Sequence, residues 1–414
     1  MIINMKKSFI FSVFLVSVCL AAWASRVEAA ASVVYTTKTS LSDVACTGNN
    51  CVAVGNNLIA QSVNKGKTWK VVLSKNIAPH IDGSNLEDVD CVGNLCIGVG
   101  QGATIVRSSD SGKTWKVVGN TLVALNKDSF ASYISGVDCV DKDVCYAVGG
   151  NFHNGGDINK FSQAFGSVIL KTTNGGLTWN VDKIEKAVFN YPFPDLTSTS
   201  NPNMFEKKYV ATDEVPLHLM DKILCKNRME CFGIGGQRSI FHTTDGWKTV
   251  TLQEFKVDNP VKLLTNGPND FSSFVYFVDG QISNTPQKVA RYGFSDIGFT
   301  GDGGVIVEAM DNGVHIALKS MDNGQTWKNI NIPLSISAGD AGGKLACYKS
   351  VCVLTVQNLF AKKVNILTSL DNGNTWKATI FKKTVSVSGA ACADANSCFV
   401  VGDTIPKGVV IKVK

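Results

Sequence analysis

Short runs of alternating apolar and polar residues, separated by Gly, Asn or Asp, fill most of the chain. In SDVACTGNNCVAVG, which begins at Ser42, two such runs flank a turn. Alternation with a period of two is typical of half-buried β-strands, and Gly and Asn between them favour a tight hairpin. The same pattern begins again at Glu87, Ser135, Asp221, Ser295, Lys344 and Gly389. The sequence therefore predicts an all-β fold built from seven related hairpins.

A second repeat, Ser/Thr-x-Asp/Asn-x-Gly-x-Thr-Trp, follows each of the first six hairpins. We expect its Asp or Asn to hold turn amides, its Gly to take a left-handed conformation and its Trp to pack against strands. One copy, TTDGWKTV, is degenerate, with Trp247 in place of Gly and Val250 in place of Trp. The structural residues predicted from this repeat are Asn64, Trp69, Asp110, Trp115, Asn174, Trp179, Asp245, Asp322, Trp327, Asp371 and Trp376.

These segments resemble the Asp-box, or BNR, repeat, with five near-complete copies. The resemblance implies a β-propeller whose four-stranded antiparallel blades, with strands a to d, carry the box at the turn between c and d. The chain is similar to the photosystem II stability/assembly-factor type of Asp-box propeller, which assists other proteins without chemistry. The likeness covers the repeats but not the insertions. The regular cysteine pairs depart from that type, so a photosynthetic role is not carried over.

The count of strands predicts how the ring closes. Seven a/b hairpins are present with only six c/d units, and the final segment Gly408–Lys414 supplies one further strand c. Ser32–Thr39 alternates like a strand and precedes the first hairpin, so we expect it to complete the last blade as strand d. Residues 30–414 then form one seven-bladed propeller, closed by pairing of the amino- and carboxy-terminal strands, with about 55 residues per blade.

The amino terminus predicts export. Lys6 and Lys7 precede an apolar run from Phe9 to Trp23, and small residues around Ala29 fit a signal-peptidase site, so residues 1–29 are assigned to a signal peptide. No later stretch approaches the roughly 20 apolar residues of a membrane-spanning helix. The rest of the chain has no Asn-x-Ser/Thr sequon. We expect a secreted or periplasmic, bacterial protein.

Thirteen cysteines become twelve once Cys19 is assigned to the signal peptide. The twelve form six close pairs, each around a turn, where facing Cβ atoms of a hairpin lie within bonding range. An exported chain meets oxidising conditions, so disulfides that staple individual hairpins are predicted; zinc, which needs four converging ligands, is the competing interpretation. Lipidation of Cys19 is a further alternative, and it also leaves twelve. The pairs are Cys46/Cys51, Cys91/Cys96, Cys139/Cys145, Cys225/Cys231, Cys347/Cys352 and Cys392/Cys398.

The blade frame separates two faces. The a/b and c/d turns share one face, and three insertions, at 151–165, 182–217 and 255–291, fall on the other. Long ordered excursions are more often functional than idle. The second insertion mixes aromatic and acidic residues, which suit sugar faces or protein side chains. Its candidate binding residues are Phe189, Tyr191, Phe193, Asp195, Phe205, Glu206, Tyr209, Asp213 and Glu214.

Catalysis is weighed against this binding hypothesis. A sialidase needs three arginines for its substrate, but beyond the signal peptide only Arg107, Arg228, Arg238 and Arg291 are present, and Arg228 lies in a hairpin turn on the opposite face. Other glycoside hydrolases need two carboxylates about 5 to 10 Å apart. The sequence selects no pair among Asp157, Asp195, Glu206, Asp213, Glu214, Asp270 and Asp279.

The composition limits the classes of partner that the protein can bind. A formal charge of +6 is small for 414 residues and implies no polyanion such as nucleic acid. The five histidines are scattered without metal-ligand spacing, so no metal or cofactor is expected. The sequence predicts a monomeric, non-catalytic platform for a protein or glycan partner. A glycoside hydrolase that uses carboxylates of the insertions is the alternative.

Overall fold

The fold is described from a computed structural model. It covers residues 31–73, 85–118, 131–152, 165–182, 186–189, 220–235, 239–252, 276–278, 281–283, 292–311, 314–330, 332–333, 340–358, 363–381, 386–404 and 407–413. These residues form strands and turns, and no helix suited to crossing a membrane occurs among them. The predicted signal peptide, residues 1–29, lies outside the described residues.

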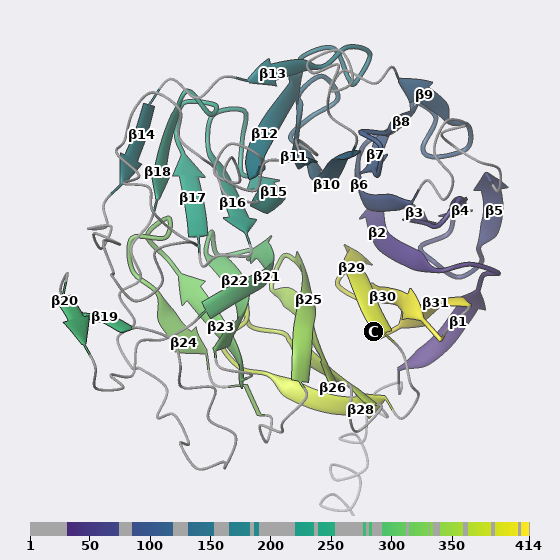
Figure 1. The fold of residues 1–414 in the computed structure, drawn as a ribbon. Helices are drawn as coiled ribbons and strands as arrows, with labels where there is room; N and C mark the ends of the chain where they lie inside the picture. The colour runs from purple at the N-terminus through teal and green to yellow at the C-terminus, as the bar shows by residue number, and fades with distance from the viewer. Residues whose placement is uncertain are drawn as a thin grey trace, which may run out of the picture.

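Seven sheets are arranged as blades around a central axis, and their first strands surround that axis (Figure 1). Blades one to three are β2 (Leu41–Thr47), β3 (Asn50–Gly55), β4 (Leu58–Ser62), β5 (Lys70–Leu73); β6 (Leu86–Val92), β7 (Leu95–Gly100), β8 (Ile105–Ser108), β9 (Lys116–Val118); and β10 (Ala131–Cys139), β11 (Cys145–Phe152), β12 (Phe165–Thr172), β13 (Asn180–Asp182). Blades four to six are β15 (Met220–Cys225), β16 (Cys231–Gly235), β17 (Ser239–Thr243), β18 (Thr249–Leu252); β21 (Tyr292–Phe299), β22 (Val305–Asp311), β23 (Val314–Ser320), β24 (Lys328–Ile330); and β25 (Asp340–Tyr348), β26 (Val351–Asn358), β27 (Lys363–Ser369), β28 (Lys377–Phe381).

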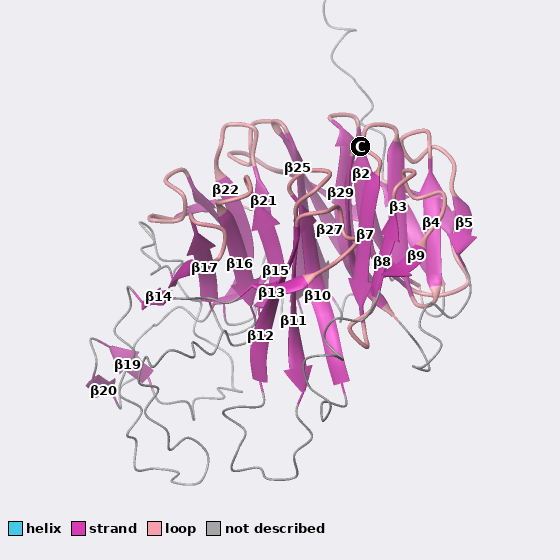
Figure 2. Ribbon diagram, turned by 90° about the horizontal axis from the view of Figure 1, so that it is seen from above, coloured by secondary structure: helices cyan, strands magenta, loops and turns pink. Residues whose placement is uncertain are grey.

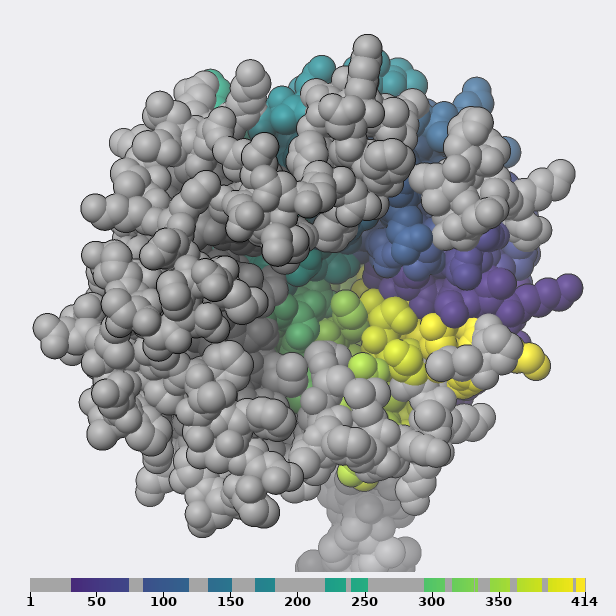
Figure 3. All heavy atoms as spheres, in the orientation of Figure 1, coloured from purple at the N-terminus to yellow at the C-terminus, as the bar shows by residue number. Residues whose placement is uncertain are grey.

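Blade seven joins the two ends of the chain, as the strand count predicted. It contains β29 (Ser386–Asp394), β30 (Ser397–Asp403), β31 (Gly408–Lys412) and, as its outermost strand, β1 (Ser32–Thr36). β1 pairs antiparallel with β31, and the backbone N–H of Thr37 donates to the carbonyl of Gly408 over 2.8 Å. In Figure 3 the purple amino-terminal atoms lie beside the yellow carboxy-terminal ones. The seven-bladed ring closed by its termini is confirmed.

Two features of the insertions depart from the expected four-stranded pattern. Lys186–Phe189 forms β14, which pairs parallel with β18 and gives blade four a fifth strand. An outer strand leaves backbone groups unpaired, and this short segment satisfies some of them. Within the third insertion, β19 (Tyr276–Val278) and β20 (Gln281–Ser283) form a two-stranded sheet of their own. The rest of both segments lies outside the described residues.

All six predicted disulfides are present, each between directly opposed residues of a hairpin with Cα atoms 3.9 to 4.1 Å apart. Because the sulfurs of each pair are bonded to each other, they are not available as zinc ligands. Loops this short give about 2 kcal/mol each in the loop-entropy model, so the bridges stabilise individual hairpins. Blade five lacks cysteines, and there Lys319 donates to Asp302 over 2.8 Å near the same turn.

Six segments, which we call box turns, make the hydrogen bonds expected from the second repeat. In blade two, Asp110 accepts from the backbone N–H of Thr114, and Ser108 Oγ accepts from that of Gly112, both over 2.9 Å. A Cβ added to Gly112 would lie 2.5 Å from the side chain of Val52 in the preceding blade, so only glycine fits there. The same pair of bonds recurs from Ser62, Thr172, Thr243, Ser320 and Ser369.

The box turns and the a/b turns contact each other. The backbone N–H of Ser111 in a box turn donates to the carbonyl of Asn94 in the hairpin turn of the same blade over 2.9 Å, and Gly175 donates to Asp143 over 2.8 Å. Most of the short turns gather along one edge of the ring (Figure 2). The prediction that both turn types share one face, which we call the staple face, is confirmed.

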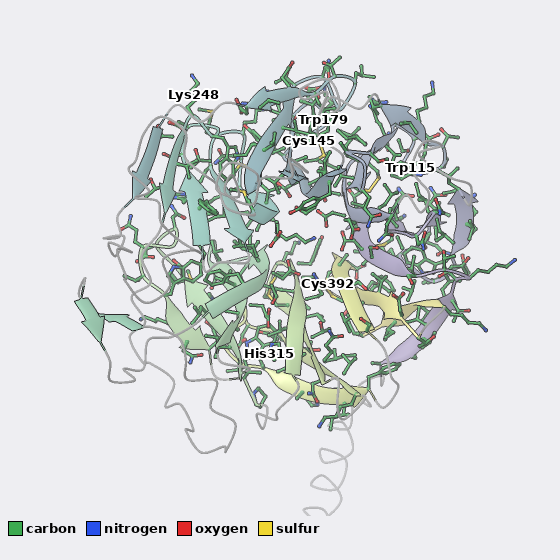
Figure 4. The ribbon with its side chains drawn as sticks, viewed as in Figure 1. Trp115, Cys145, Trp179, Lys248, His315 and Cys392 are labelled. Atoms are coloured by element: carbon green, nitrogen blue, oxygen red, sulfur yellow. A yellow bond between two sulfur atoms is a disulfide. The ribbon has the colours of Figure 1, made fainter. Side chains whose placement is uncertain are left out.

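The core consists of seven clusters of buried apolar side chains, one at each contact between neighbouring blades. Each tryptophan of a box turn packs into the cluster between its own blade and the preceding one. Figure 4 shows Trp179 near Cys145, and both belong to the cluster between blades two and three. The repeat therefore supplies one anchor for each of six contacts, while the contact between blades six and seven has none.

The second cysteine of each disulfide is also a core residue, in addition to its part in stapling the hairpin. It is the first or second residue of the second strand of its blade, and both faces of that strand are covered by neighbouring blades. The first cysteine, at the end of the innermost strand, is half-buried in five of the six pairs. The bridge therefore also fixes a side chain that packs between blades. The fully buried members, each in one of the core clusters, are Cys51, Cys96, Cys145, Cys231, Cys352 and Cys398.

The degenerate box of blade four keeps its tryptophan anchor in a different way. Trp247 takes a left-handed backbone conformation, with φ of 73°, at the position where other boxes have glycine. Its side chain is fully buried with Tyr146 and Val250 in the cluster between blades three and four. Moving the tryptophan by three residues thus preserves the packing, which the sequence motif did not reveal.

We expect Trp247→Ala to destabilise the protein strongly. Removal of a fully buried tryptophan leaves a cavity between two blades, at a cost of about 3 to 5 kcal/mol. Thermal unfolding should show a large decrease in Tm for this variant. Lys248→Ala, at the neighbouring exposed position, is the matched control and should leave Tm unchanged. Equal Tm values for the two variants would contradict the anchoring role.

Candidate functional site

The predicted binding residues fall almost entirely outside the described residues. Phe189 ends β14, with its backbone opposite Leu252 of β18. Tyr191, Phe193, Asp195, Phe205, Glu206, Tyr209, Asp213 and Glu214 lie outside, as do the other candidate catalytic carboxylates, Asp157, Asp270 and Asp279. The described part of the site therefore consists of the strand ends from which the insertions leave and of the side chains around the axis.

The strand ends agree with the predicted face. At one end of blade three, Cys145 pairs with Thr172 next to the staple face, and at the other end Phe152 pairs with Phe165. The insertion between Phe152 and Phe165 therefore leaves from the end of the blade opposite to the disulfide. We call this opposite side the insertion face.

Every innermost strand contains a β-bulge at the same place. The register of each first strand shifts next to its second strand, close to the insertion face. Bulges redirect side chains and are common beside functional sites. The residues at these shifts, which we call the bulge ring, are Ser42, Glu87, Ser135, Asp221, Ser295, Gly342, Gly343 and Ser388. The polar members are half-buried, so polar groups surround the axis at this end.

Glu87 is the best-defined member of the bulge ring. Its carboxylate accepts from the side-chain amides of Asn85 and Gln101, over 3.1 and 3.2 Å. Burial raises the pKa of Glu87 despite these two hydrogen bonds. Isolated backbone bridges join Asn56 to Asn85 and Gln101 to Tyr133, so the same group connects blades one, two and three. The mouth of the axis is therefore a fixed polar surface at these blades.

A layer of carboxylates lies deeper along the same strands. Each accepts a backbone N–H from the innermost strand of the next blade, over 2.7 to 3.1 Å, and so joins two blades. We call them the axial carboxylates: Asp43 with Val89, Asp88 with Val137, Asp90 with Cys139, Asp138 with Cys225, and Asp296 with Leu345. Their first role is structural, because each satisfies a backbone donor that faces the axis.

Burial disfavours the charged form of these groups. Desolvation raises the pKa of Asp43 and Asp138 well above the usual value, and raises the pKa of Asp90 to about 6. Lys222 offsets part of this cost through its contact with Asp88. Desolvation lowers the pKa of Lys222, but the attraction of Asp88, Asp43 and Asp296 together prevails and raises it above its ordinary value. The layer is thus short of positive charge.

Lys222 crosses an entire blade to reach its partner. It belongs to blade four, whereas Asp88 belongs to blade two, and blade three has Gly136 at the equivalent position. A Cβ at Gly136 would lie 2.9 Å from the carbonyl oxygen of Asp221 and 3.1 Å from the Cα of Lys222. Glycine therefore lets the innermost strand of blade four, which carries Lys222, approach blade three closely.

The sequence analysis missed the axial carboxylates, although a signal was present. In the hairpins that begin at Ser42 and Glu87, an aspartate stands three residues before the first cysteine, and Asp296 occupies the same frame. Such a repeated acidic residue on an otherwise apolar strand indicates a buried hydrogen-bonded carboxylate.

Two of the four arginines considered for a sialidase make contacts between neighbouring blades. The Arg107 side chain donates to the carbonyl of Gly175 in the next blade over 2.5 Å, and Arg228 pairs with Asp141 over 2.6 Å. Arg238 and Arg291 lie outside the described residues. Among the residues that are described, no group of three or more His, Cys, Asp or Glu side chains is placed to hold a metal ion.

Neither protein-family models nor curated proteins match the chain. Solved structures do match, at 12 to 15% sequence identity. YCF48 bound to D1 peptide is 13% identical with a TM-score of 0.55, and the match covers 93% of this chain and 94% of that one. YCF48 from Cyanidioschyzon merolae is 15% identical with a TM-score of 0.52, and the match covers 93% of this chain and 98% of that one. A third is the GH74 enzyme of Niastella koreensis, which is 12% identical with a TM-score of 0.52. That match covers 92% of this chain but only 52% of the enzyme.

The chain is a seven-bladed β-propeller. The resemblance to photosystem II assembly-factor propellers, predicted from the repeats, is confirmed for the fold. At these identities the similarity does not extend to activity, because one propeller architecture serves binding proteins and enzymes alike. The function therefore depends on the residues at the site and not on the fold.

We expect Lys222→Met to destabilise the propeller by about 3 to 5 kcal/mol, because it leaves buried Asp88 without its counter-charge. Chemical denaturation should show the loss. The double variant Lys222→Met with Asp88→Asn should recover part of it, since the unpaired charge is removed. A double variant no more stable than the single one would contradict an electrostatic origin.

Proposed function

We propose that this protein is an exported, non-catalytic binding platform that holds a peptide segment of a partner protein on its insertion face. The observation that carries the proposal is the difference between the two faces. On the staple face, disulfides and box turns close the ends of the blades with tight, mutually bonded turns. On the insertion face, the polar bulge ring surrounds the axis and the long insertions begin.

The chemistry of the bulge ring suits an extended peptide. Ser42, Glu87 and Asp221 bring hydroxyl and carboxylate groups to the ends of innermost strands, and a peptide backbone presents donors and acceptors to such groups. Aromatic residues of the second insertion, such as Tyr191 and Phe193, would supply apolar contact area for its side chains. A rigid propeller under these groups lowers the entropic cost of binding.

A structure with the same fold supports a peptide as the ligand. YCF48, which matches over nearly its whole length, has been solved with a bound D1 peptide. Export is supported separately, because six disulfides are typical of proteins that fold in an oxidising compartment. Together with the signal peptide assigned to residues 1–29, the disulfides support a site of action in the periplasm or outside a bacterial cell.

Glycoside hydrolysis is the second candidate, because the GH74 enzyme has the same architecture. The axial carboxylates are engaged with backbone N–H groups of neighbouring blades, so the acid and base would have to come from the insertions. Asp195, Glu206, Asp213 and Glu214 are the residues to replace in testing that alternative. A glycan ligand bound without hydrolysis would be a third outcome.

The test is selection of a random-peptide phage library on the intact protein, followed by measurement of Kd for the selected peptides. In a variant with residues 191–216 replaced by a Gly-Ser linker of equal length, β14 is retained so that the edge of blade four stays covered. We expect Kd to rise at least about tenfold, because the main contact surface is lost. Leu177→Ser and Met321→Ser, at exposed positions on the staple face, are the controls.

Unchanged Kd in the linker variant, or equal losses in the staple-face controls, would contradict the proposed surface. The same preparations should be incubated with a glycan panel. Sugar release by the parent protein that disappears when Asp195, Glu206, Asp213 and Glu214 are replaced by their amides would establish the hydrolase instead.

A further inference from the structure

We propose that the axial carboxylates of blades one to three form a pH-sensitive clamp, which holds blades one to four together in acid and loosens them as the pH rises. The clamp is a continuous series of contacts. Asp43 joins blade one to blade two, Asp88 and Asp90 join blade two to blade three, and Asp138 joins blade three to blade four. This inference does not depend on the identity of the partner.

The charges around the clamp do not balance. Asp43 faces Asp88 and Lys222; Asp90 faces Asp88, Asp138 and Lys222. Glu87, at the mouth of the axis, also interacts with the charges of Asp88 and Lys222. Asp296 interacts with Lys222 and with Lys344 of blade six. Lys222 is the one cation among these described groups in blades one to four. If every carboxylate of the clamp ionises, the negative charges of neighbouring blades repel one another.

The direction of the effect follows from proton binding. Asp90 has a pKa of about 6 in the folded protein and about 4 in an unfolded chain. Between these values the folded state holds a proton that the unfolded state has lost, so the stability falls as the pH rises through this window. Asp43 and Asp138, whose pKa values are also raised by desolvation, act with the same sign.

The staple face behaves in the opposite way and provides an internal control. Desolvation opposes ionisation of Asp110, but hydrogen bonds from Thr114 and Ser108 prevail and lower its pKa to about 2. A carboxylate of this kind stabilises the fold above its unfolded pKa, and that contribution is lost only in strong acid. The pH range in which Asp110 affects stability lies below that of Asp90, so a pH titration distinguishes the two contributions.

The experiment compares Tm from pH 4.5 to pH 8 in three proteins: the parent, the double variant Asp90→Asn with Asp138→Asn, and the control Asp110→Asn. Asparagine keeps an acceptor for the backbone N–H but cannot ionise. We expect Tm of the parent to decrease as the pH rises, with Asp90 alone accounting for a roughly 25-fold decrease in the folding equilibrium constant over this pH range. The double variant should show a flatter profile, and the control should follow the parent.

A direct titration keeps the proposal testable if the double variant fails to fold. In the parent protein labelled at aspartate 13Cγ, at least one carboxyl should titrate near pH 6, and that resonance should be absent from the single variant Asp90→Asn. Amide exchange, corrected for its intrinsic pH dependence, should become faster with rising pH at Val137 and Cys139 relative to Gly112. Titration of every aspartate below pH 5, or a double variant with the pH slope of the parent, would overturn the clamp.

Discussion

The structure depends on the contact between neighbouring blades, because each blade buries its apolar side chains only against the next one. The seven core clusters all lie at such contacts. An open series of blades would expose the outward face of its first and last members, so the pairing of Ser32–Thr36 with Gly408–Lys412 has consequences far beyond its few hydrogen bonds. Closure gives blade one a neighbour and turns seven marginal sheets into one body.

Aspartate is used in two opposite environments to maintain these contacts. In the box turns, Asp110 and Asp371 are half-buried at the surface and accept hydrogen bonds from their own turn, which lower their pKa to about 2. At the axis, Asp43 is buried and Asp138 is half-buried, each accepts a backbone N–H of the next blade, and desolvation raises the pKa of both. The balance between desolvation and hydrogen bonds to the carboxylate decides the direction of the pKa shift. The two groups of aspartates therefore have pKa shifts of opposite direction.

Most of the architecture could be predicted from the sequence because a repeat places equivalent residues at equivalent positions. The bond between Cys91 and Cys96 follows from hairpin geometry, and the missing strand follows from counting. The burial of Cys96 between two blades does not follow, because it depends on how a neighbouring sheet covers the hairpin. The contact of Lys222 with Asp88, and the close approach of the Lys222 backbone to Gly136, are relations among three blades that no single motif contains. The candidate binding residues beyond β14 stay predictions.

The bulge ring and the axial carboxylates are successive residues of the same strands, and this adjacency connects binding to charge. Glu87 directly precedes Asp88, and Asp221 directly precedes Lys222, so the groups at the mouth are fixed by the ion pair beneath them. A bulge sets the direction of its side chains through the backbone, and that backbone is held by the carboxylate contacts to the next blade. The contacts of Asp43 and Asp88 lie directly beneath this polar surface, whereas those of Asp90 and Asp138 end on Cys139 and Cys225, at the disulfide-bonded ends of the same strands.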